Sequence, residues 1–263
     1  MNTPRPPPAR APHVPLTDYY PTEQDRPAYL RRMFDSSAAD YDRVEHMLAW
    51  GTGPRYRREA LARGGLRTGM KVLDVGTGTG LVAVQAGSLT GNAALVTGID
   101  PSPGMMAAGK LPGTMRLIEG RAESLPFPDE HFDFLSMGYA LRHISDLGVA
   151  FAEFERVLKP GGRLCLLEIT QAQNRLGRWL LKNYMRGVIP LLTRFVSRRQ
   201  DTATIWRYHW DSIAACVPPE QVLATLSAVG LTEVRRHLVL GVFSEYQAVK
   251  VNSANPADPG RKN

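Results

Sequence analysis

The chain of 263 residues lacks the features that mark secreted, disulfide-stabilised and membrane-spanning proteins. Its two cysteines, Cys165 and Cys216, are too few for a disulfide framework or a cysteine-based metal cluster, so we expect two buried, inert thiols and no metal site. No apolar run reaches the roughly 18 residues of a membrane-spanning helix, and the first residues contain no apolar stretch of the kind a signal peptide needs. We therefore expect a soluble, cytoplasmic protein with one main domain.

Proline is concentrated at one end of the chain. Residues 1–27 contain eight of the twenty prolines and little apolar periodicity, so we expect a disordered tail there. Residues 251–263 are polar and contain proline and glycine, and they are expected to form a second disordered tail. The folded domain is then predicted to span residues 28–250.

Acidic residues are almost absent from residues 171–210. This window holds one acid, Asp201, and its excess of positive charge equals the formal charge of the whole chain, +7. The cations are Arg175, Arg178, Lys182, Arg186, Arg194, Arg198, Arg199 and Arg207. Because bulky apolar residues alternate with them, we predict a helical substrate lid over 171–215. Its part 175–199 either contacts the inner face of a membrane peripherally or packs on the domain with solvated arginines. Nucleic-acid binding is not expected, because the window contains no recognised binding module.

A glycine-rich turn is the most informative motif of the chain. An apolar strand runs directly into alternating glycines at Gly76, Gly78 and Gly80, and a second apolar run ends on Asp100, twenty residues further on. Such a turn allows a ligand to approach the backbone closely, and the acid at the end of the next strand can accept both hydroxyls of a ribose. The spacing of the glycines differs from that of dinucleotide loops and of P-loops. The sequence therefore indicates a nucleoside cofactor that is neither a dinucleotide nor a nucleoside triphosphate.

Strand and helix signals alternate along the chain. We predict helices over 28–66, broken near Asp40 and at 51–54, and later helices at 80–88, 103–109, 146–158 and 219–229. Strands are predicted at 70–75, 94–99, 115–118, 132–137, 163–169, 232–239 and 242–249. This order is typical of an α/β fold, a Rossmann-like sheet of seven strands with helices on both faces and a closing antiparallel hairpin.

These motifs together resemble the ubiquinone/menaquinone-biosynthesis C-methyltransferases, which are class I S-adenosylmethionine (SAM) methyltransferases. The resemblance covers about residues 30–250 and is carried by 33–42, the glycine turn with Asp100 and Met105, 122–133, 139–146 and 156–168. Residues 122–133 and 156–168 resemble many small-molecule methyltransferases, whereas Phe34, Tyr41, Asp42, Leu141 and Arg142 resemble this family more specifically.

The resemblance implies a SAM site around the glycine turn. Asp100 would accept the ribose hydroxyls, Met105 would flank the adenine, and Tyr41 would close over the methionine end, although Met105 and Tyr41 also suit ordinary packing. Asp100 also suits the N-cap of the following helix. Arg121 stands where relatives have an acid or amide, so either the Ala122 backbone reads the adenine or Arg121 stacks or turns outward. The implied cofactor residues are Tyr41, Asp74, Gly76, Thr77, Gly78, Thr79, Gly80, Asp100, Pro101, Met105, Arg121, Ala122 and Gly138.

The resemblance also implies catalytic residues just beyond the fourth strand, namely Tyr139, Arg142 and His143. Arg142 would stabilise a developing phenolate. His143 replaces the asparagine of relatives, and we hypothesise that it is a general base or proton relay; the alternative is a structural histidine that caps the helix near Ser145. A polar-aromatic run, 207–211, either lines the substrate pocket or supports the lid.

The function implied is SAM-dependent C-methylation of a demethyl benzoquinol or menaquinol. Departures from the family at 121, 138, 143 and 240–247 leave two alternatives open: a paralogue that methylates another phenolic or natural product on O or N, and a non-catalytic assembly subunit that binds SAM or lipid. The expected partner is a lipophilic small molecule. The sequence is compatible with a monomer or a homodimer.

Overall fold

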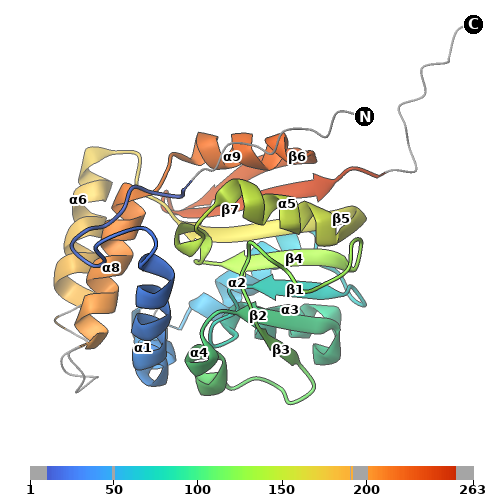
Figure 1. The fold of residues 1–263 in the computed structure, drawn as a ribbon, viewed down its shortest axis with the longest axis horizontal. Helices are drawn as coiled ribbons and strands as arrows, with labels where there is room; N and C mark the ends of the chain where they lie inside the picture. The colour runs from blue at the N-terminus through green and yellow to red at the C-terminus, as the bar shows by residue number, and fades with distance from the viewer. Residues whose placement is uncertain (1–10, 49–50, 190, 192–200, 253–263) are drawn as a thin grey trace, which may run out of the picture.

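The computed structural model describes residues 11–48, 51–189, 191 and 201–252. Its centre is a seven-stranded sheet with the order β3-β2-β1-β4-β5-β7-β6 (Figure 1). The strands are β1 (Val72–Val75), β2 (Val96–Asp100), β3 (Arg116–Glu119), β4 (Phe132–Gly138), β5 (Leu158–Ile169), β6 (Leu231–Val239) and β7 (Phe243–Lys250). The first five pair in parallel, while β7 runs antiparallel to β5 and β6. The predicted α/β fold and its closing hairpin are confirmed.

Helices cover both faces of the sheet. The helices of the described residues, on these faces and beyond them, are α1 (Arg26–Leu48), α2 (Gly53–Arg63), α3 (Leu81–Thr90), α4 (Pro103–Ala108), α5 (Leu147–Val157), α6 (Arg175–Asn183), α8 (Asp201–Ala215) and α9 (Pro219–Ala228). Successive strand residues point to opposite faces. Val72 and Phe134 therefore join the core under α2 and α3, while Leu73 and Leu135 join the core under α5 and α9.

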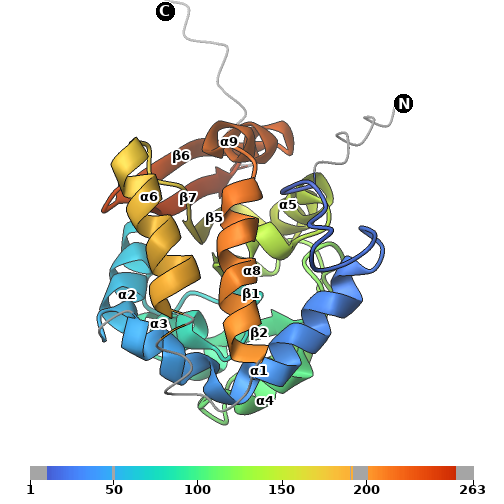
Figure 2. The ribbon, with the colours of Figure 1, turned by 90° about the vertical axis from the view of Figure 1, so that its left-hand side faces the viewer.

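A third layer lies outside the carboxyl ends of the parallel strands. It consists of α1, α6 and α8, which lie together at one end of the sheet in both views (Figures 1 and 2). Its core contains Met33 and Val44 of α1 packed with Ile205 and Trp210 of α8. This layer forms a wall above the sheet edge, where ligands of open α/β sheets usually bind.

The predicted break near Asp40 is wrong, because α1 runs unbroken from Arg26 to Leu48. The hydroxyls of Ser36 and Ser37 donate to the carbonyl of Met33, so these polar side chains bond along the helix and do not interrupt it. Packing against α8 then fixes the helix along its length.

The predicted N-terminal tail is wrong for residues 11–27. Tyr20 is 1 % exposed, and the hydroxyl of Tyr19 donates to Asp211 of α8 at 2.6 Å. The amide of Val217 donates to the carbonyl of Pro12 at 2.7 Å. Burial of aromatic side chains outweighs the effect of the prolines here. Residues 1–10 and 253–263 of the two expected tails lie outside the described residues.

The two cysteines differ in exposure. Cys165 is buried in β5, where burial raises the pKa of its thiol, whereas Cys216 is only partly buried. In the part of the chain that the structure describes, no cluster of three metal-ligating side chains occurs. None of the helices in that part is both long and apolar enough to span a bilayer.

Candidate active site

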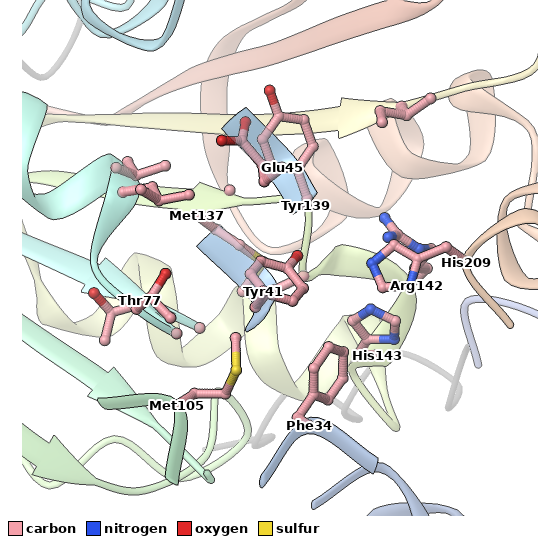
Figure 3. A pocket seen from close by; sticks show the side chains of 18 of the residues that line it. Phe34, Tyr41, Glu45, Thr77, Met105, Met137, Tyr139, Arg142, His143 and His209 are labelled. Carbon is pink, nitrogen blue, oxygen red and sulfur yellow. The ribbon is translucent and has the colours of Figure 1, made fainter. Parts of the chain in front are cut away.

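A pocket of about 600 Å³ lies at the carboxyl ends of β1, β2, β4 and β5, beneath α1 and α8. In Figure 3, Thr77 and Met105 lie on one side of it, and Arg142, His143 and Phe34 lie on the other. The predicted site residues that line it are Tyr41, Gly76, Thr77, Gly78, Thr79, Asp100, Pro101, Met105, Arg121, Ala122, Gly138, Tyr139, Arg142 and His143.

The glycine turn forms one end of the pocket. The amides of Gly76 and Thr77 donate to the carbonyl of Ile99, at 2.8 and 3.1 Å, and so hold the turn against the end of β2. Gly76 has a φ of +66°, and a Cβ there would lie 2.6 Å from the Cβ of Ala140. Only glycine fits this combination of backbone angle and close approach.

Two predicted cofactor residues, Asp74 and Gly80, do not line the pocket. Asp74 lies beneath the turn and accepts hydrogen bonds from the hydroxyls of Thr77, at 2.8 Å, and Ser136, at 2.6 Å. Burial raises the pKa of Asp74 to about 6. Gly80 is the N-cap residue of α3, and a Cβ there would clash with Leu111. Both residues shape the turn from behind, because their side of the backbone faces the core.

Asp100 ends β2 and lines the pocket beside the turn. Its carboxylate accepts the amide of Gly78 at 2.8 Å and the amide of Ser102 at 2.8 Å. Burial raises its pKa to about 6, although these two amides oppose the shift. The N-cap of α4 is Ser102, which accepts the amide of Met105. Capping therefore leaves Asp100 available for a ligand.

Two acids of helix α1, to which the sequence analysis gave no such role, bind the start of α4 and the glycine turn. Asp35 accepts the hydroxyl of Ser102 at 2.5 Å and the amide of Gly104 at 2.9 Å. Asp42 accepts the hydroxyl of Thr79 at 2.5 Å. The partners are far apart in sequence, so only the spacing of acids along one helix could have hinted at this role.

Arg121 lines the pocket, and its partly exposed guanidinium is held by neighbouring side chains. Its guanidinium donates to the hydroxyl of Ser145 at 2.8 Å and pairs with Glu123. Ala122 remains in the pocket wall next to it. That the backbone of Ala122 reads the adenine stays a prediction.

Arg142 is 1 % exposed at the opposite end of the pocket from the turn. It forms a buried ion pair with Glu168 and donates to the hydroxyl of Ser212 at 3.1 Å. Its own carbonyl accepts the guanidinium of Arg26 at 2.6 Å. These contacts join β5, α1 and α8 around one cation and fix its position.

The capping alternative for His143 is wrong, whereas its role as a base stays a prediction, since it lines the pocket. Its ring nitrogens are buried and have no hydrogen-bond partner among the described residues, and its ring stacks on Tyr208 at 5.7 Å. Burial and the charge of Arg142 lower its pKa well below 6.5. The cap of α5 is instead Asp146, which accepts the amide of Gly148 at 2.8 Å. His143 is thus a neutral imidazole and a weak proton acceptor.

Tyr139 lies in a strained backbone conformation with a φ of +60°. Its amide donates to the carbonyl of Leu167 at 2.7 Å, and the Arg57 guanidinium lies 5.7 Å from the centre of its ring. Such conformations persist only where the surroundings enforce them, and they cluster at functional sites. The strain places the ring in the pocket wall beyond β4.

Glu45 is a pocket residue that sequence reasoning missed. It lies one helical turn after Tyr41 on α1, pairs with the buried Arg57 of α2, and lies near Tyr139 in Figure 3. Its spacing of four residues from Tyr41, which places both on one helix face, was the available signal.

Apolar and aromatic side chains close the pocket from above. Of the run 207–211, only His209 lines the pocket, while Tyr208 packs behind it against His143. Burial lowers the pKa of His209 to about 3. The other residues of this roof are Leu181, Tyr184, Met185, Ile189 and Trp206. The predicted basic residues Arg194, Arg198 and Arg199 lie outside the described residues.

Comparison with known proteins places these features in one family. The model of the ubiE/COQ5 methyltransferase family matches residues 22–250. A ubiquinone/menaquinone biosynthesis C-methyltransferase of Geobacter sulfurreducens is 30 % identical, over 89 % of this chain and 93 % of the relative. Its counterpart in Geotalea daltonii is 31 % identical, over 84 % and 96 %. A SAM-dependent methyltransferase structure from Thermotoga maritima, a possible histamine N-methyltransferase, has a TM-score of 0.59 at 20 % identity, over 84 % and 99 %, and shares the fold.

Proposed function

Since the chain belongs to the ubiE/COQ5 methyltransferase family, we propose that it transfers a methyl group from SAM to a ring carbon of a demethyl benzoquinol or menaquinol. The observation that carries the proposal is the continuity of one pocket. Its first end has the glycine turn and Asp100, and its second end has Arg142 and Tyr139 under an apolar roof. A nucleoside and a lipophilic ring can therefore meet in one enclosed space.

The first end has the hydrogen-bond acceptor and donor groups that SAM requires. Asp100 offers a carboxylate for the two ribose hydroxyls, which would be charge-assisted hydrogen bonds. Gly76 and Gly78 line the pocket without side chains, so the turn and the start of α3 can receive the methionine carboxylate. Met105 and Ala122 flank the space left for the adenine. When bound, SAM supplies an electrophilic methyl group on sulfur.

The second end has groups suited to a phenolic ring. Transfer forms a bond between the ring carbon and the methyl carbon, the carbon–sulfur bond breaks with its electron pair going to sulfur, and the ring carbon then loses its proton to a base. The ring attacks best as a phenolate, whose charge the Arg142 guanidinium would stabilise from the pocket wall. The apolar roof excludes water, which strengthens this interaction.

We assign the role of proton acceptor to Glu45. His143 and His209 are poor acceptors, because burial lowers the pKa of each imidazole. Glu45 lines the pocket, and its ion pair with the buried Arg57 holds the carboxylate in place there. The oxygen of Glu45 that does not accept from Arg57 Nη2 can then receive a proton from the substrate hydroxyl or ring carbon, directly or through one water.

Methyl transfer to a panel of reduced demethylquinols tests the function. We expect S-adenosylhomocysteine and a product heavier by one methylene unit, with the new methyl group on a ring carbon by NMR. Transfer only to other phenols, or only to oxygen or nitrogen, would favour the paralogue alternative. SAM binding with no transfer to any acceptor would favour the assembly subunit.

Glu45→Gln tests the proton acceptor. The amide still accepts a hydrogen bond from Arg57 but cannot take a proton, so we expect kcat to fall by about 100-fold or more with SAM affinity unchanged. Glu123→Gln is the matched control, because Glu123 also lines the pocket while its carboxylate accepts the amide of Ser145 at 2.6 Å. Equal turnover of Glu45→Gln and wild type would remove Glu45 from the chemistry.

A further inference from the structure

The segment that comprises α6, the following π-helical turn η3 (Tyr184–Val188), Ile189 and Leu191 has apolar side chains both in the pocket lining and at the surface. Its inner face lines the pocket with Leu181, Tyr184, Met185 and Ile189. Its outer face exposes large apolar side chains, with Leu176 at 67 % and Trp179 at 60 % exposure. The outer face comprises Leu176, Trp179, Leu180, Val188 and Leu191. A surface helix ordinarily has one apolar side, so the second one indicates an interface.

Cations without neighbouring acids accompany this outer face. Arg175, Arg178 and Lys182 follow the exposed apolar residues along α6 and form no ion pair among the described residues. Arg186 lies 3.8 Å from Asp211. The sequence contains no acid between positions 171 and 200. A partner surface that matches this face must therefore be apolar inside and anionic at its rim.

The rim of the pocket adds one more exposed apolar residue. Leu240, at the turn between β6 and β7, is 85 % exposed and also belongs to the pocket lining. Figure 2 shows α6 at the surface beside the β6–β7 hairpin, with α8 next to it. The exposed apolar side chains thus lie at the outside of the same wall that encloses the pocket.

We propose that the outer face of α6 and η3 docks on an anionic lipid bilayer, so that the pocket receives a lipid-tailed acceptor directly from the membrane. Leucine and tryptophan side chains would enter the acyl–headgroup boundary, while arginine and lysine heads reach lipid phosphates. The inference of docking depends only on the composition of this outer face. The identity of the acceptor rests on the proposed function.

A second copy of this chain fits the face less well than a bilayer does. A two-fold interface would bring each copy's Arg175, Arg178 and Lys182 toward the same cations of the other copy. The face has no acids to pair with them, and like charges across an interface oppose association. A bilayer that contains anionic lipid offers the opposite charge without that penalty.

Vesicle flotation with the full chain tests the docking. Wild type should float with vesicles of phosphatidylcholine and phosphatidylglycerol, and the binding should weaken when salt is raised or phosphatidylglycerol is omitted. The variant Arg175→Gln/Arg178→Gln/Lys182→Gln should partition on the order of 100-fold more weakly, because each cation near an anionic surface contributes separately. The variant Leu176→Gln/Trp179→Gln/Leu180→Gln should also lose binding. A matched control neutralises three exposed cations on other elements, Arg58, Lys110 and Arg116, and should float like wild type.

Activity assays separate this inference from the proposed function. Both α6 variants should methylate a short-tailed soluble quinol at the wild-type rate and lose transfer to a long-tailed quinol embedded in vesicles. Absence of flotation by wild type, or equal flotation by all variants, would overturn the docking. So would a dimer in sedimentation that the Leu176→Gln/Trp179→Gln/Leu180→Gln variant dissociates. Failure of wild type to methylate the soluble quinol would refute the proposed function. Flotation would still test the docking independently.

Discussion

Asp100 is the residue on which cofactor binding is expected to depend most directly. In Asp100→Asn the side chain keeps its shape but loses its charge, and one of the two ribose hydroxyls loses its acceptor. A hydrogen bond to a charged group contributes about 1.5–3 kcal/mol, so we expect the dissociation constant of SAM to rise on the order of 100-fold. Isothermal titration calorimetry of wild type and variant measures this change.

The pH dependence of SAM binding gives a sharper test of the same residue. Burial raises the pKa of Asp100 to about 6, and only the deprotonated carboxylate accepts both hydroxyls. Affinity should therefore be full above pH 6 and fall up to about tenfold for each pH unit below it, and Asp100→Asn should lose this dependence. Asp74→Asn is the control, because its pKa is also raised to about 6 but it lies outside the pocket. Constant wild-type affinity from pH 5 to pH 8 would refute the reasoning.

Two further substitutions test the second end of the pocket. His143→Asn should leave the pH profile of kcat between pH 7 and pH 9 unchanged, because the pKa of His143 lies well below 6.5. Disappearance of a titration step across that range would support the base hypothesis. Glu168→Gln leaves the buried Arg142 uncompensated, so the free energy of unfolding in urea should fall by about 3–5 kcal/mol. Glu59→Gln removes an exposed, solvent-screened pair with Arg55 and should have a much smaller effect on the free energy of unfolding. Equal effects of the two substitutions would contradict the argument.

The sheet and the first end of the pocket could be predicted from local sequence. Buried parallel strands are continuous apolar runs, and the turn after β1 needs glycine, so both leave signals within a few residues. The spacing from Gly80 to Asp100 reflects one strand–helix–strand unit. These signals predicted the part of the pocket wall that contains Asp100 and Met105.

Contacts between distant segments could not be predicted in the same way. Glu45, Asp35 and Asp42 reach the site because α1 packs along α4 and α8, and nothing near them in sequence encodes that packing. The position of Asp74 could not be predicted either, because it lies next to the turn in sequence while its side chain points into the core. The ion pair between Arg142 and Glu168 likewise depends on the way β5 and η2 (Leu141–His143) meet.

The two buried carboxyls behind and beside the glycine turn lower the stability of the folded protein at neutral pH. The pKa values of Asp74 and Asp100 in the folded protein, each about 6, lie above the ordinary value of 3.8. Their protonated forms therefore stabilise the fold at low pH, and this contribution is lost as the pH rises from about 4 to about 6, by about 3 kcal/mol per group. At neutral pH the folded protein holds two ionised, buried acids, of which only Asp100 lines the crevice. A nucleoside whose hydroxyls donate to Asp100 relieves part of that cost, so occupancy of the crevice and resistance to unfolding rise together.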